Sequence, residues 1–155
     1  MKVRKITRTD DVEWLRMRLA LWPQGSAEEH RAEMGEQFGN AKSFAVFVAD
    51  RGDGTLGGFL EASLRAYADG CETKPVGYIE GWYVDEDLRR QGVGGELVKM
   101  AEQWATDQGC KQMASDCLID NDVSYTAHLA LGYQEAERLI HFKKDLPGYQ
   151  GRRGA

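Results

Sequence analysis

The stretch DLRRQGVGGELV, from Asp87 to Val98, combines residue types that suit the binding of an anion. Two arginines precede three glycines that lie within four positions, and an apolar helical pattern follows at once. Each glycine weakens a first helical turn by roughly 1 kcal/mol relative to alanine, so three of them need a physical reason. Backbone N–H groups at a helix N-terminus, left open by glycine, can hold a pyrophosphate. A glycine-rich turn without a ligand is the alternative, but Arg89 and Arg90 beside the three glycines favour the anion site.

Two other phosphate-binding motifs do not fit this stretch. A P-loop requires G-x-x-x-x-G-K-[ST], and no Lys-Ser or Lys-Thr pair follows the glycines. A dinucleotide fingerprint requires G-x-G-x-x-G; Gly92 and Gly94 match its first two glycines, but position 97 is a leucine. The sequence therefore predicts a pyrophosphate seated on a helix N-terminus outside these two motifs.

Two carboxylates lie inside apolar segments that have the pattern of strands. Glu80 interrupts YIEGWYV, and Asp116 interrupts MASDCL. Burying a carboxylate without a partner is expensive, so each needs an ion pair or an open cleft. The cysteines at positions 71, 110 and 117 are interpreted as structural, and no metal-binding constellation is visible in the sequence.

The composition narrows the classes of protein and partner. With 155 residues, 42% of them hydrophobic, the chain can form one compact domain with a core. The formal net charge of -5 argues against nucleic acid and is compatible with a cationic small-molecule partner. An odd number of cysteines without C-x-x-C spacing indicates reduced thiols and a cytoplasmic location. No signal peptide is visible, and no apolar run approaches the ~20 residues of a membrane span, so no membrane partner is expected.

The helices that must position these residues follow from periodicity and capping. The first is expected to be capped by Thr9 or Asp10 and to end at Pro23. Its apolar face is predicted to consist of Val12, Leu15, Leu19 and Trp22. Ser26 and Glu29 form an S-x-x-E capping box for a second helix. The other predicted boundaries are an end of the second helix near Gly39, a third helix from about Gly92 to Gln108, and a fourth from Asn121 or Asp122 to Gly132.

The strands follow from β-branched and aromatic runs, with a hairpin at Gly52-Asp53-Gly54. The predicted strands are 3–7, 43–50, 55–65, 76–84, 113–118, 134–137 and 139–144. This order predicts an α+β fold, a mixed sheet with helices on both faces. One domain is expected over residues 1–146, and residues 147–155 are expected to be a flexible tail because they lack periodicity.

At this point the sequence resembles a known family. RRQGVG matches the Q/R-x-x-G-x-G/A acetyl-CoA signature of the GCN5-related N-acetyltransferase (GNAT) superfamily, and it lies between the fourth strand and the third main helix as in that superfamily. Within the superfamily, the chain is similar to the aminoglycoside 6′-N-acetyltransferases. The segments that carry this similarity are LALWP, YADGC, IEGWYV, MASD, DNDVSYTAHLALGY and EAERLIHF. The resemblance implies a GNAT fold, with a mixed, mostly antiparallel central sheet that splays at its fourth strand.

The resemblance also implies a set of acetyl-CoA contacts. Backbone groups of the fourth strand would meet the pantetheine arm and the thioester, the glycine turn would meet the pyrophosphate, and Asn121 would bind the pantetheine arm. The implied cofactor-binding residues are Trp82, Tyr83, Val84, Arg89, Arg90, Gln91, Gly92, Val93, Gly94, Gly95 and Asn121. A buried core strand, solvated arginine side chains and a helix N-cap at Asn121 are the alternative interpretations, and each is compatible with the implied role.

For the substrate, the resemblance implies a site that recognises a polycation rich in amine and hydroxyl groups. The implied substrate-binding residues are Trp22, Tyr67, Glu80, Asp116 and Glu137. Trp22 could instead be an ordinary core tryptophan, and Glu137 a solvated strand end. The amine arrives protonated, so a base must remove a proton, and the sequence does not choose between the two carboxylates of the strands. His128 stands where many superfamily members carry a tyrosine acid, so it either protonates the coenzyme A thiolate or only packs beside the pantetheine arm.

The expected reaction is transfer of acetyl from acetyl-CoA to the 6′-amino group of an aminoglycoside, by direct attack in a ternary complex. The developing oxyanion would be met by a backbone N–H near Val84 at the splayed strand. Antibiotic resistance and a homodimer are further expectations from the resemblance. Two alternatives remain: acetyl transfer to another amine, such as a polyamine, an amino acid or a protein N-terminus, and a non-catalytic sensor of acyl-CoA.

Overall fold

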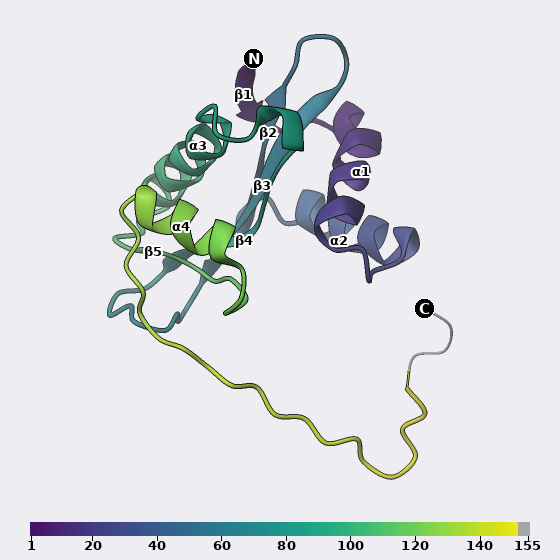
Figure 1. The fold of residues 1–155 in the computed structure, drawn as a ribbon, viewed down its shortest axis with the longest axis vertical. Coiled ribbons are helices and arrows are strands. Elements are labelled where there is room, and N and C mark those ends of the chain that lie inside the picture. The colour runs from purple at the N-terminus through teal and green to yellow at the C-terminus, as the bar shows by residue number, and fades with distance from the viewer. Residues whose placement is uncertain (152–155) are drawn as a thin grey trace.

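The computed structural model describes residues 1–151, which fold around one five-stranded sheet with the strand order β1-β2-β3-β4-β5 (Figure 1). The strands are β1 Lys2–Lys5, β2 Phe44–Asp50, β3 Leu56–Arg65, β4 Val76–Val84 and β5 Met113–Ser115. The first four pair antiparallel, and β5 joins β4 in parallel. The helices are α1 Asp11–Leu21, α2 Ala27–Gly39, α3 Val93–Asp107 and α4 Asp122–Ala130. The α1 and α2 helices cover one face of the sheet and α3 and α4 lie on the other, so the expected α+β architecture is confirmed.

Side chains of the central strands alternate between the two faces of the sheet and contribute to two hydrophobic cores, one on each face. Phe47 and Leu60 pack toward α3, which buries Leu97 and Ala101 against them. Phe59, one residue before Leu60, packs on the opposite face. The buried residues of that second core are Trp14, Met17, Met34, Val46, Val48, Leu56 and Phe59. None of the helices in residues 1–151 is long and apolar enough to cross a membrane.

The buried face of α1 differs in part from the one predicted, since Leu15 and Trp22 pack against the second core as expected. Val12, expected in the core, is 74% exposed, whereas Trp14, Met17 and Arg18 are buried. Trp14 and Met17 are larger and lie three residues apart, so turning this face inward removes more apolar surface from water. The sequence pattern did not reveal this face because it includes Arg18. An arginine is normally expected to be exposed to solvent unless a buried partner for it is known.

The sheet opens between β4 and β5, as the expected splay requires. The two strands pair only from Gly77 opposite Met113 to Ile79 opposite Ser115, and β4 then continues to Val84 without a partner on that side in residues 1–151. The fifth strand is consequently shorter than the predicted 113–118. The open part of β4 leaves backbone groups that a ligand can pair with in the manner of an added strand.

A β-bulge in β4 decides where Glu80 points. Across β3 and β4, Glu61 pairs with Gly81 and Ala62 pairs with Ile79, so Glu80 is an extra residue in the ladder. A bulge re-aims side chains that strict alternation would place on one face. Glu80 is therefore exposed in the middle of a strand whose neighbouring positions are buried.

The two strands predicted at 134–137 and 139–144 are absent, and this prediction is wrong. After α4 the chain passes the β3–β4 loop, where Ala136 contacts Gly70, and then extends away from the body of the fold (Figure 1). A strand requires a neighbour for its N–H and C=O groups, and this segment pairs with no strand of its own chain within residues 1–151. The division into a domain 1–146 and a tail 147–155 stays a prediction, and residues 152–155 lie outside the described part of the chain.

Candidate active site

The carboxylate of Glu80 is held by the neighbouring strand. Its Oε1 accepts hydrogen bonds from Ser63 Oγ at 2.6 Å and from Arg65 Nε at 2.9 Å, and its Oε2 accepts one from Arg65 Nη2 at 2.8 Å. This bidentate pair is a strong, orienting arrangement for a carboxylate. Glu80 in turn raises the pKa of the Arg65 guanidinium. Both oxygens of Glu80 are thus engaged by a cation before any substrate arrives.

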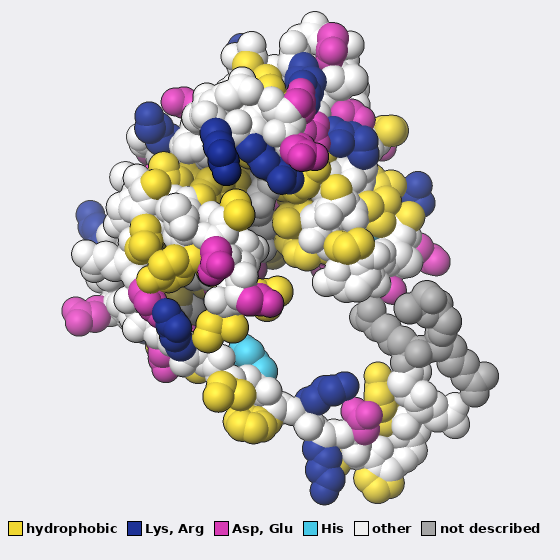
Figure 2. Space-filling model, in the orientation of Figure 1, with side chains coloured by type: hydrophobic (Ala, Val, Ile, Leu, Met, Phe, Trp, Pro, Cys, Tyr) yellow, Lys and Arg dark blue, Asp and Glu magenta, His cyan; other side chains and the backbone are white. Residues whose placement is uncertain are grey.

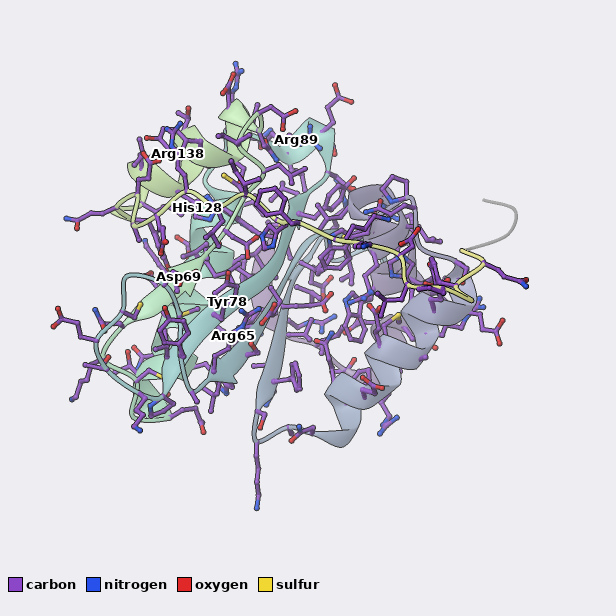
Figure 3. All side chains as sticks on the ribbon, turned by 90° about the horizontal axis from the view of Figure 1, so that it is seen from below. Arg65, Asp69, Tyr78, Arg89, His128 and Arg138 are labelled. Carbon is purple, nitrogen blue, oxygen red and sulfur yellow. The ribbon has the colours of Figure 1, made fainter. Side chains whose placement is uncertain are left out.

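Asp116 lies one residue beyond β5, with its side chain directed to the same group of residues. Its Oδ2 accepts a hydrogen bond from the Tyr78 hydroxyl, and Asp116 itself is exposed. Burial, followed by this hydrogen bond, raises the pKa of the Tyr78 hydroxyl well above its usual range. The Arg65 guanidinium carbon lies 3.5 Å from the centroid of the Tyr78 ring, and the two side chains lie together in Figure 3. Arg65 and Tyr78 therefore link the two predicted carboxylates.

Sequence reasoning missed Arg65 and Tyr78, although one signal was present. Tyr78 lies two residues before Glu80 on the same strand, and strand alternation places such residues on one face. The pairing of Ser63 with Tyr78 across the hairpin then brings Arg65 within reach of that face. This second step depends on the register of the hairpin, which the sequence does not state.

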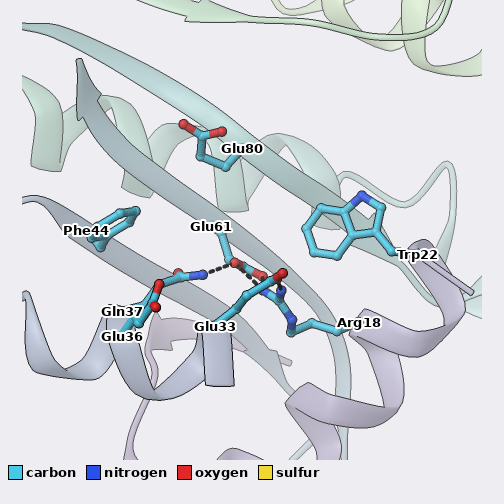
Figure 4. Close-up of a pocket in the computed structure, with 8 residues that line it drawn as sticks. All are labelled: Arg18, Trp22, Glu33, Glu36, Gln37, Phe44, Glu61 and Glu80. Carbon is cyan, nitrogen blue, oxygen red and sulfur yellow. Dashed lines mark hydrogen bonds and ion pairs between the residues drawn. The ribbon is translucent and has the colours of Figure 1, made fainter. Parts of the chain in front are cut away.

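Trp22, just beyond the end of α1, lies against Gly81 of β4. A Cβ at Gly81 would lie 2.4 Å from Cη2 of the Trp22 indole, so only glycine allows this contact. Trp22 and Glu80 line one pocket of about 380 Å³, a size typical of small-molecule sites (Figure 4). The other lining residues are Arg18, Glu33, Glu36, Gln37, Phe44 and Glu61. The structure thus brings two predicted substrate residues together.

Tyr67 and Glu137 form a separate group at the β3–β4 loop. Tyr67 is 69% exposed, and its hydroxyl donates a hydrogen bond to Asp69 Oδ1 at 2.8 Å. This bond, together with the charges of Asp69 and Glu137, raises the pKa of the Tyr67 hydroxyl. The segment that carries Glu137 passes this loop, where Ala136 contacts Gly70, although it is not the strand that was expected.

A buried network of ion pairs and hydrogen bonds around Arg18 contacts Trp22 on the side of helices α1 and α2. Arg18, with 2% of its side chain exposed, pairs with both oxygens of Glu61 and with Glu33, and its guanidinium lies 4.8 Å from the Trp22 ring centroid. Burial raises the pKa of the Glu61 carboxyl, and Arg18 opposes this shift. His30 Nδ1 accepts from Arg18 Nε at 3.2 Å, so its Nε2–H donates to the Trp22 carbonyl at 3.1 Å. Loss of either Arg18 or Glu61 would leave the remaining charge buried and unpaired, so the network resists rearrangement. Its contacts with the ring and the carbonyl of Trp22 therefore hold that residue in place.

The glycine turn presents open backbone N–H groups, as predicted. The first intrahelical bond of α3 runs from the Glu96 N–H to the Gly92 carbonyl at 3.0 Å, so the N–H groups of residues 93–95 precede the hydrogen-bonded ladder. Gly92 has φ +83°, and Arg90 adopts the left-handed region as well, at φ 62°. A non-glycine residue in that region stores strain, which is frequent at ligand sites.

The side chains of the turn have structural partners. Arg89 Nε donates to the Val84 carbonyl at 2.9 Å, and Gln91 Nε2 donates to the Asp87 carbonyl at 2.8 Å. Arg89 is thus not merely solvated; it ties the turn to the open end of β4. What remains available to an anion is the backbone of the turn and the exposed side chain of Arg90.

Trp82, in the open part of β4, gives a further indication that a ligand binds there. Its indole Nε1 is buried without a hydrogen-bond partner among the described residues, which costs about 1–3 kcal/mol unless a ligand supplies an acceptor. The same ring lies 3.0 Å from the position that a Cβ would take at Gly94. The open strand, the orphaned indole N–H and the N-terminus of α3 together fit an extended ligand that ends in a pyrophosphate.

Asn121 is the N-cap of α4, as its alternative interpretation predicted. Its Oδ1 accepts a hydrogen bond from the Ser124 N–H at 3.1 Å. The amide NH2 group of Asn121 makes no other bond within residues 1–151. The capping role and the predicted role toward pantetheine are therefore compatible.

Both ring nitrogens of His128 are occupied. The Ser124 carbonyl can only accept, so Nδ1–H donates to it at 2.7 Å, and Nε2 then accepts from the Ser115 hydroxyl at 2.7 Å. The ring also packs edge-on against Trp82 and Tyr133, at centroid distances of 5.3 and 5.7 Å. In this tautomer Nε2 carries no proton, so the neutral ring has none to give to a thiolate from that atom.

Comparison with known proteins identifies the family of this chain. The family model described as acetyltransferase (GNAT) family matches residues 12–133. The chain belongs to the GNAT family of acetyltransferases. An aminoglycoside N(6′)-acetyltransferase type 1 of Klebsiella aerogenes is 44% identical over 146 residues, covering 93% of this chain and 96% of that protein.

Two solved GNAT structures extend the comparison. The apo aminoglycoside antibiotic 6′-N-acetyltransferase AAC(6′)-IG of Acinetobacter haemolyticus is 36% identical, with a TM-score of 0.87 over 94% of this chain and 99% of that one. AAC(6′)-Iy in complex with the bisubstrate analogue CoA-S-monomethyl-acetylneamine is also 36% identical, with a TM-score of 0.87 over 94% and 98% of the chains. The GNAT fold expected from the sequence is confirmed.

The bonds of His128 lead to a prediction for this GNAT chain. His128→Phe is expected to keep kcat within about tenfold of wild type, because loss of a true general acid typically costs ~10²-fold or more. Coenzyme A leaves readily as a thiolate, and no nitrogen of His128 is free to reach it. Part of the effect should fall on acetyl-CoA affinity through the contact with Trp82. The measurement is kcat against pH at saturating acetyl-CoA, with Ser115→Ala alongside. A loss of several orders of magnitude, with the basic limb abolished and affinity unchanged, would make His128 an essential acid.

Proposed function

We propose that this GNAT protein transfers acetyl from acetyl-CoA to the 6′-amino group of aminoglycosides. The observation that carries the proposal is the position of Asp116 and Glu80 where the sheet opens, linked through Tyr78 and Arg65. Glu80 also lines a pocket with an aromatic and acidic lining. Relatives that act at the 6′ position cover more than nine-tenths of the chain, and one of them binds a compound that joins coenzyme A to an aminoglycoside. Acetylation removes a positive charge from the antibiotic, so the reaction confers resistance.

Asp116 is the better candidate for the proton acceptor. The amine must lose a proton before it attacks the thioester carbonyl carbon, and the base must hold a lone pair that is accessible to the amine or to a bridging water. Glu80 is bound through both oxygens by Arg65, whereas Asp116 is exposed and accepts one hydrogen bond, from Tyr78. Glu80 then serves to attract and orient the cationic substrate.

The reaction proceeds by direct attack in a ternary complex. Asp116 takes one proton from the ammonium group, and the neutral amine then forms the C–N bond to the thioester carbonyl carbon. The resulting oxyanion collapses with cleavage of the C–S bond, so coenzyme A leaves as a thiolate. The second proton of the nitrogen passes to this thiolate as the amide forms, and Asp116 returns its proton to solvent. The three described cysteines are free thiols, and the reaction assigns none of them a covalent role. Acetyl-CoA binds along the open part of β4 with its pyrophosphate on the N-terminus of α3, and a backbone N–H near Val84 meets the developing oxyanion.

A panel of amines separates this proposal from its alternatives. Coenzyme A release would be measured with aminoglycosides, polyamines, free amino acids and peptides with a free N-terminus. Turnover restricted to aminoglycosides supports the proposal, and preferred turnover of another class would assign a different amine acetyltransferase. Acetyl-CoA binding without turnover of any amine would instead identify an acyl-CoA sensor.

We further propose that the protein acts as a homodimer in the cytoplasm, joined by the segment from residue 134 to 151, here named the arm. The arm is extended and pairs with no strand of its own chain, yet Ile140 and Phe142 are 81% and 91% exposed. Figure 2 shows hydrophobic side chains in yellow along the arm. The outer edge of β5 is also without a strand partner within residues 1–151. An arm of a second copy would satisfy such an edge and cover its apolar side chains.

The arm gives a direct prediction about mass in solution. Wild type is expected to be a dimer, and Phe142→Asp is expected to shift it to monomer, because a charge in a buried apolar contact is costly. Lys143→Asp, one position further along the same arm, is the matched control and should leave the dimer intact. The measurement is light scattering coupled to size exclusion. A monomeric wild type, or a dimer unaffected by Phe142→Asp, would contradict the role of the arm.

A further inference from the structure

The pocket that contains Trp22 and Glu80 has a second wall that the reaction above does not use. Helix α2 contributes Glu33, Glu36 and Gln37, and Figure 4 shows them opposite Glu80, with Trp22 at the side. This set of α2 residues is here named the α2 wall. Its position suggests contact with a part of the ligand other than the reacting amine.

The charge of the pocket favours cations. Four carboxylates and one guanidinium line it, and the guanidinium of Arg18 is shared between buried Glu61 and Glu33. Glu36 is exposed and makes no hydrogen bond or ion pair within residues 1–151. A concave site with an excess of one charge raises the local concentration of ligands of the opposite charge.

Gln37 supplies an independent sign of a hydrogen-bond donor in the ligand. Its Nε2 donates to Glu61, which fixes the orientation of the amide, since the opposite orientation would set two acceptors against each other. The Oε1 atom of Gln37 is buried and has no partner among the described residues. A buried acceptor without a donor is costly, so the site favours a ligand with N–H or O–H groups.

We propose that the α2 wall is a subsite for the amino groups of aminoglycoside rings remote from the acetylated 6′-amine, and that it sets the preference among aminoglycosides. Glu36, with support from Glu33, attracts these ammonium groups, and Gln37 Oε1 accepts a hydrogen bond from the same part of the ligand. The Trp22 face offers the apolar contact that a sugar ring needs. This inference rests on the proposed function, because it identifies the substrate groups that the same site recognises.

The test compares two charge-neutralising variants on one helix. Glu36→Gln removes a wall carboxylate, and Glu28→Gln removes an exposed carboxylate of α2 that does not line the pocket. The substrates are aminoglycosides that share the 6′-amino ring and differ in the number of amino groups on the other rings. Glu36→Gln should raise KM for the amine-rich members about fivefold, as expected for a partly solvated ion pair, with kcat unchanged. The effect should shrink for amine-poor members and with added salt.

The outcomes separate the subsite from the function. The α2 wall does not bind the remote amino groups if Glu36→Gln changes KM no more than Glu28→Gln does. The same conclusion holds if Glu36→Gln lowers kcat equally for all members of the series. Glu33 is left unchanged in this test, because it pairs with Arg18 and its loss would also disturb the network that holds Trp22. Wild-type turnover without any dependence on Glu36 would overturn the subsite alone. Absence of wild-type turnover on every aminoglycoside would overturn the proposed function and this inference with it.

Discussion

Asp116→Asn is expected to lower kcat for aminoglycoside acetylation by about 10²- to 10⁴-fold, the range for loss of a general base. The asparagine side chain keeps an oxygen that can accept the hydrogen bond from the Tyr78 hydroxyl, so the local geometry should survive. The dissociation constant of acetyl-CoA should be unchanged, because Asp116 lies away from the N-terminus of α3. Steady-state kinetics and calorimetry on the same preparation measure both quantities.

Glu80→Gln is the informative comparison. The Glu80 carboxylate is held by Arg65 and serves mainly to attract the cationic substrate. Its replacement by an amide should therefore raise KM, and the fold-increase in KM should exceed the fold-decrease in kcat by about tenfold. Tyr78→Phe keeps both carboxylates and removes only the hydroxyl that contacts Asp116, which makes it a control for local structure. The assignment of the base fails if Asp116→Asn retains wild-type kcat, or if Glu80→Gln shows the larger loss of kcat.

Gly92→Val is expected to weaken acetyl-CoA binding by at least about tenfold. Gly92 has φ +83°, a region that β-branched residues avoid, so the turn must rearrange and its N–H groups lose their alignment. One charge-assisted hydrogen bond to a pyrophosphate accounts for about 1.5–3 kcal/mol, which is tenfold or more in affinity. Calorimetric titration with acetyl-CoA is the measurement.

The matched control for this variant lies in the β2–β3 turn. Gly52 has φ +84° and, like Gly92, has open space around the position of a Cβ. Gly52→Val should therefore cost similar backbone strain and a similar loss of thermal stability, while acetyl-CoA affinity stays at the wild-type value. Equal affinity for both variants and wild type would show that the turn before α3 does not hold the pyrophosphate.

Much of the fold was predictable because its signals are local. β4 has the predicted bounds, and Ser26 caps α2 through the N–H of Glu29 at 3.1 Å, as the S-x-x-E pattern indicates. The start of α3 at the glycine turn and the cap of α4 at Asn121 were also predicted. Each of these features depends on residues within a few positions of one another, so the sequence alone contains the information.

The errors arise where distant residues decide the outcome. The face of α1 depends on Arg18 finding Glu61, a partner 43 residues away in sequence. The arm has the alternation of a strand, but strands also need a partner, and none is present in its own chain within residues 1–151. The local pattern predicted two strands here, and it could not show that the partner strand is missing.

The candidate site shows the same division. Glu80 and Asp116 were predicted because a carboxylate inside an apolar run is conspicuous in a sequence, and the structure brings them close through shared neighbours. Arg65 and Tyr78, which connect them, follow only from the register of the β3–β4 hairpin and its bulge. Glu36 was not predicted because exposed glutamates on a helix are common. Only its position in the wall of the pocket makes it a candidate for ligand binding.

The central claim is acetyl transfer to the 6′-amine, and a pair of substrates tests it most directly. The measurement is coenzyme A release with two aminoglycosides that differ only at position 6′, where one carries an amino group and the other a hydroxyl. We expect turnover of the amino compound, with mass and NMR spectra that place one acetyl group on the 6′-nitrogen, and no turnover of the hydroxyl compound. Equal turnover of both compounds, or acetylation at any other nitrogen, would contradict the account.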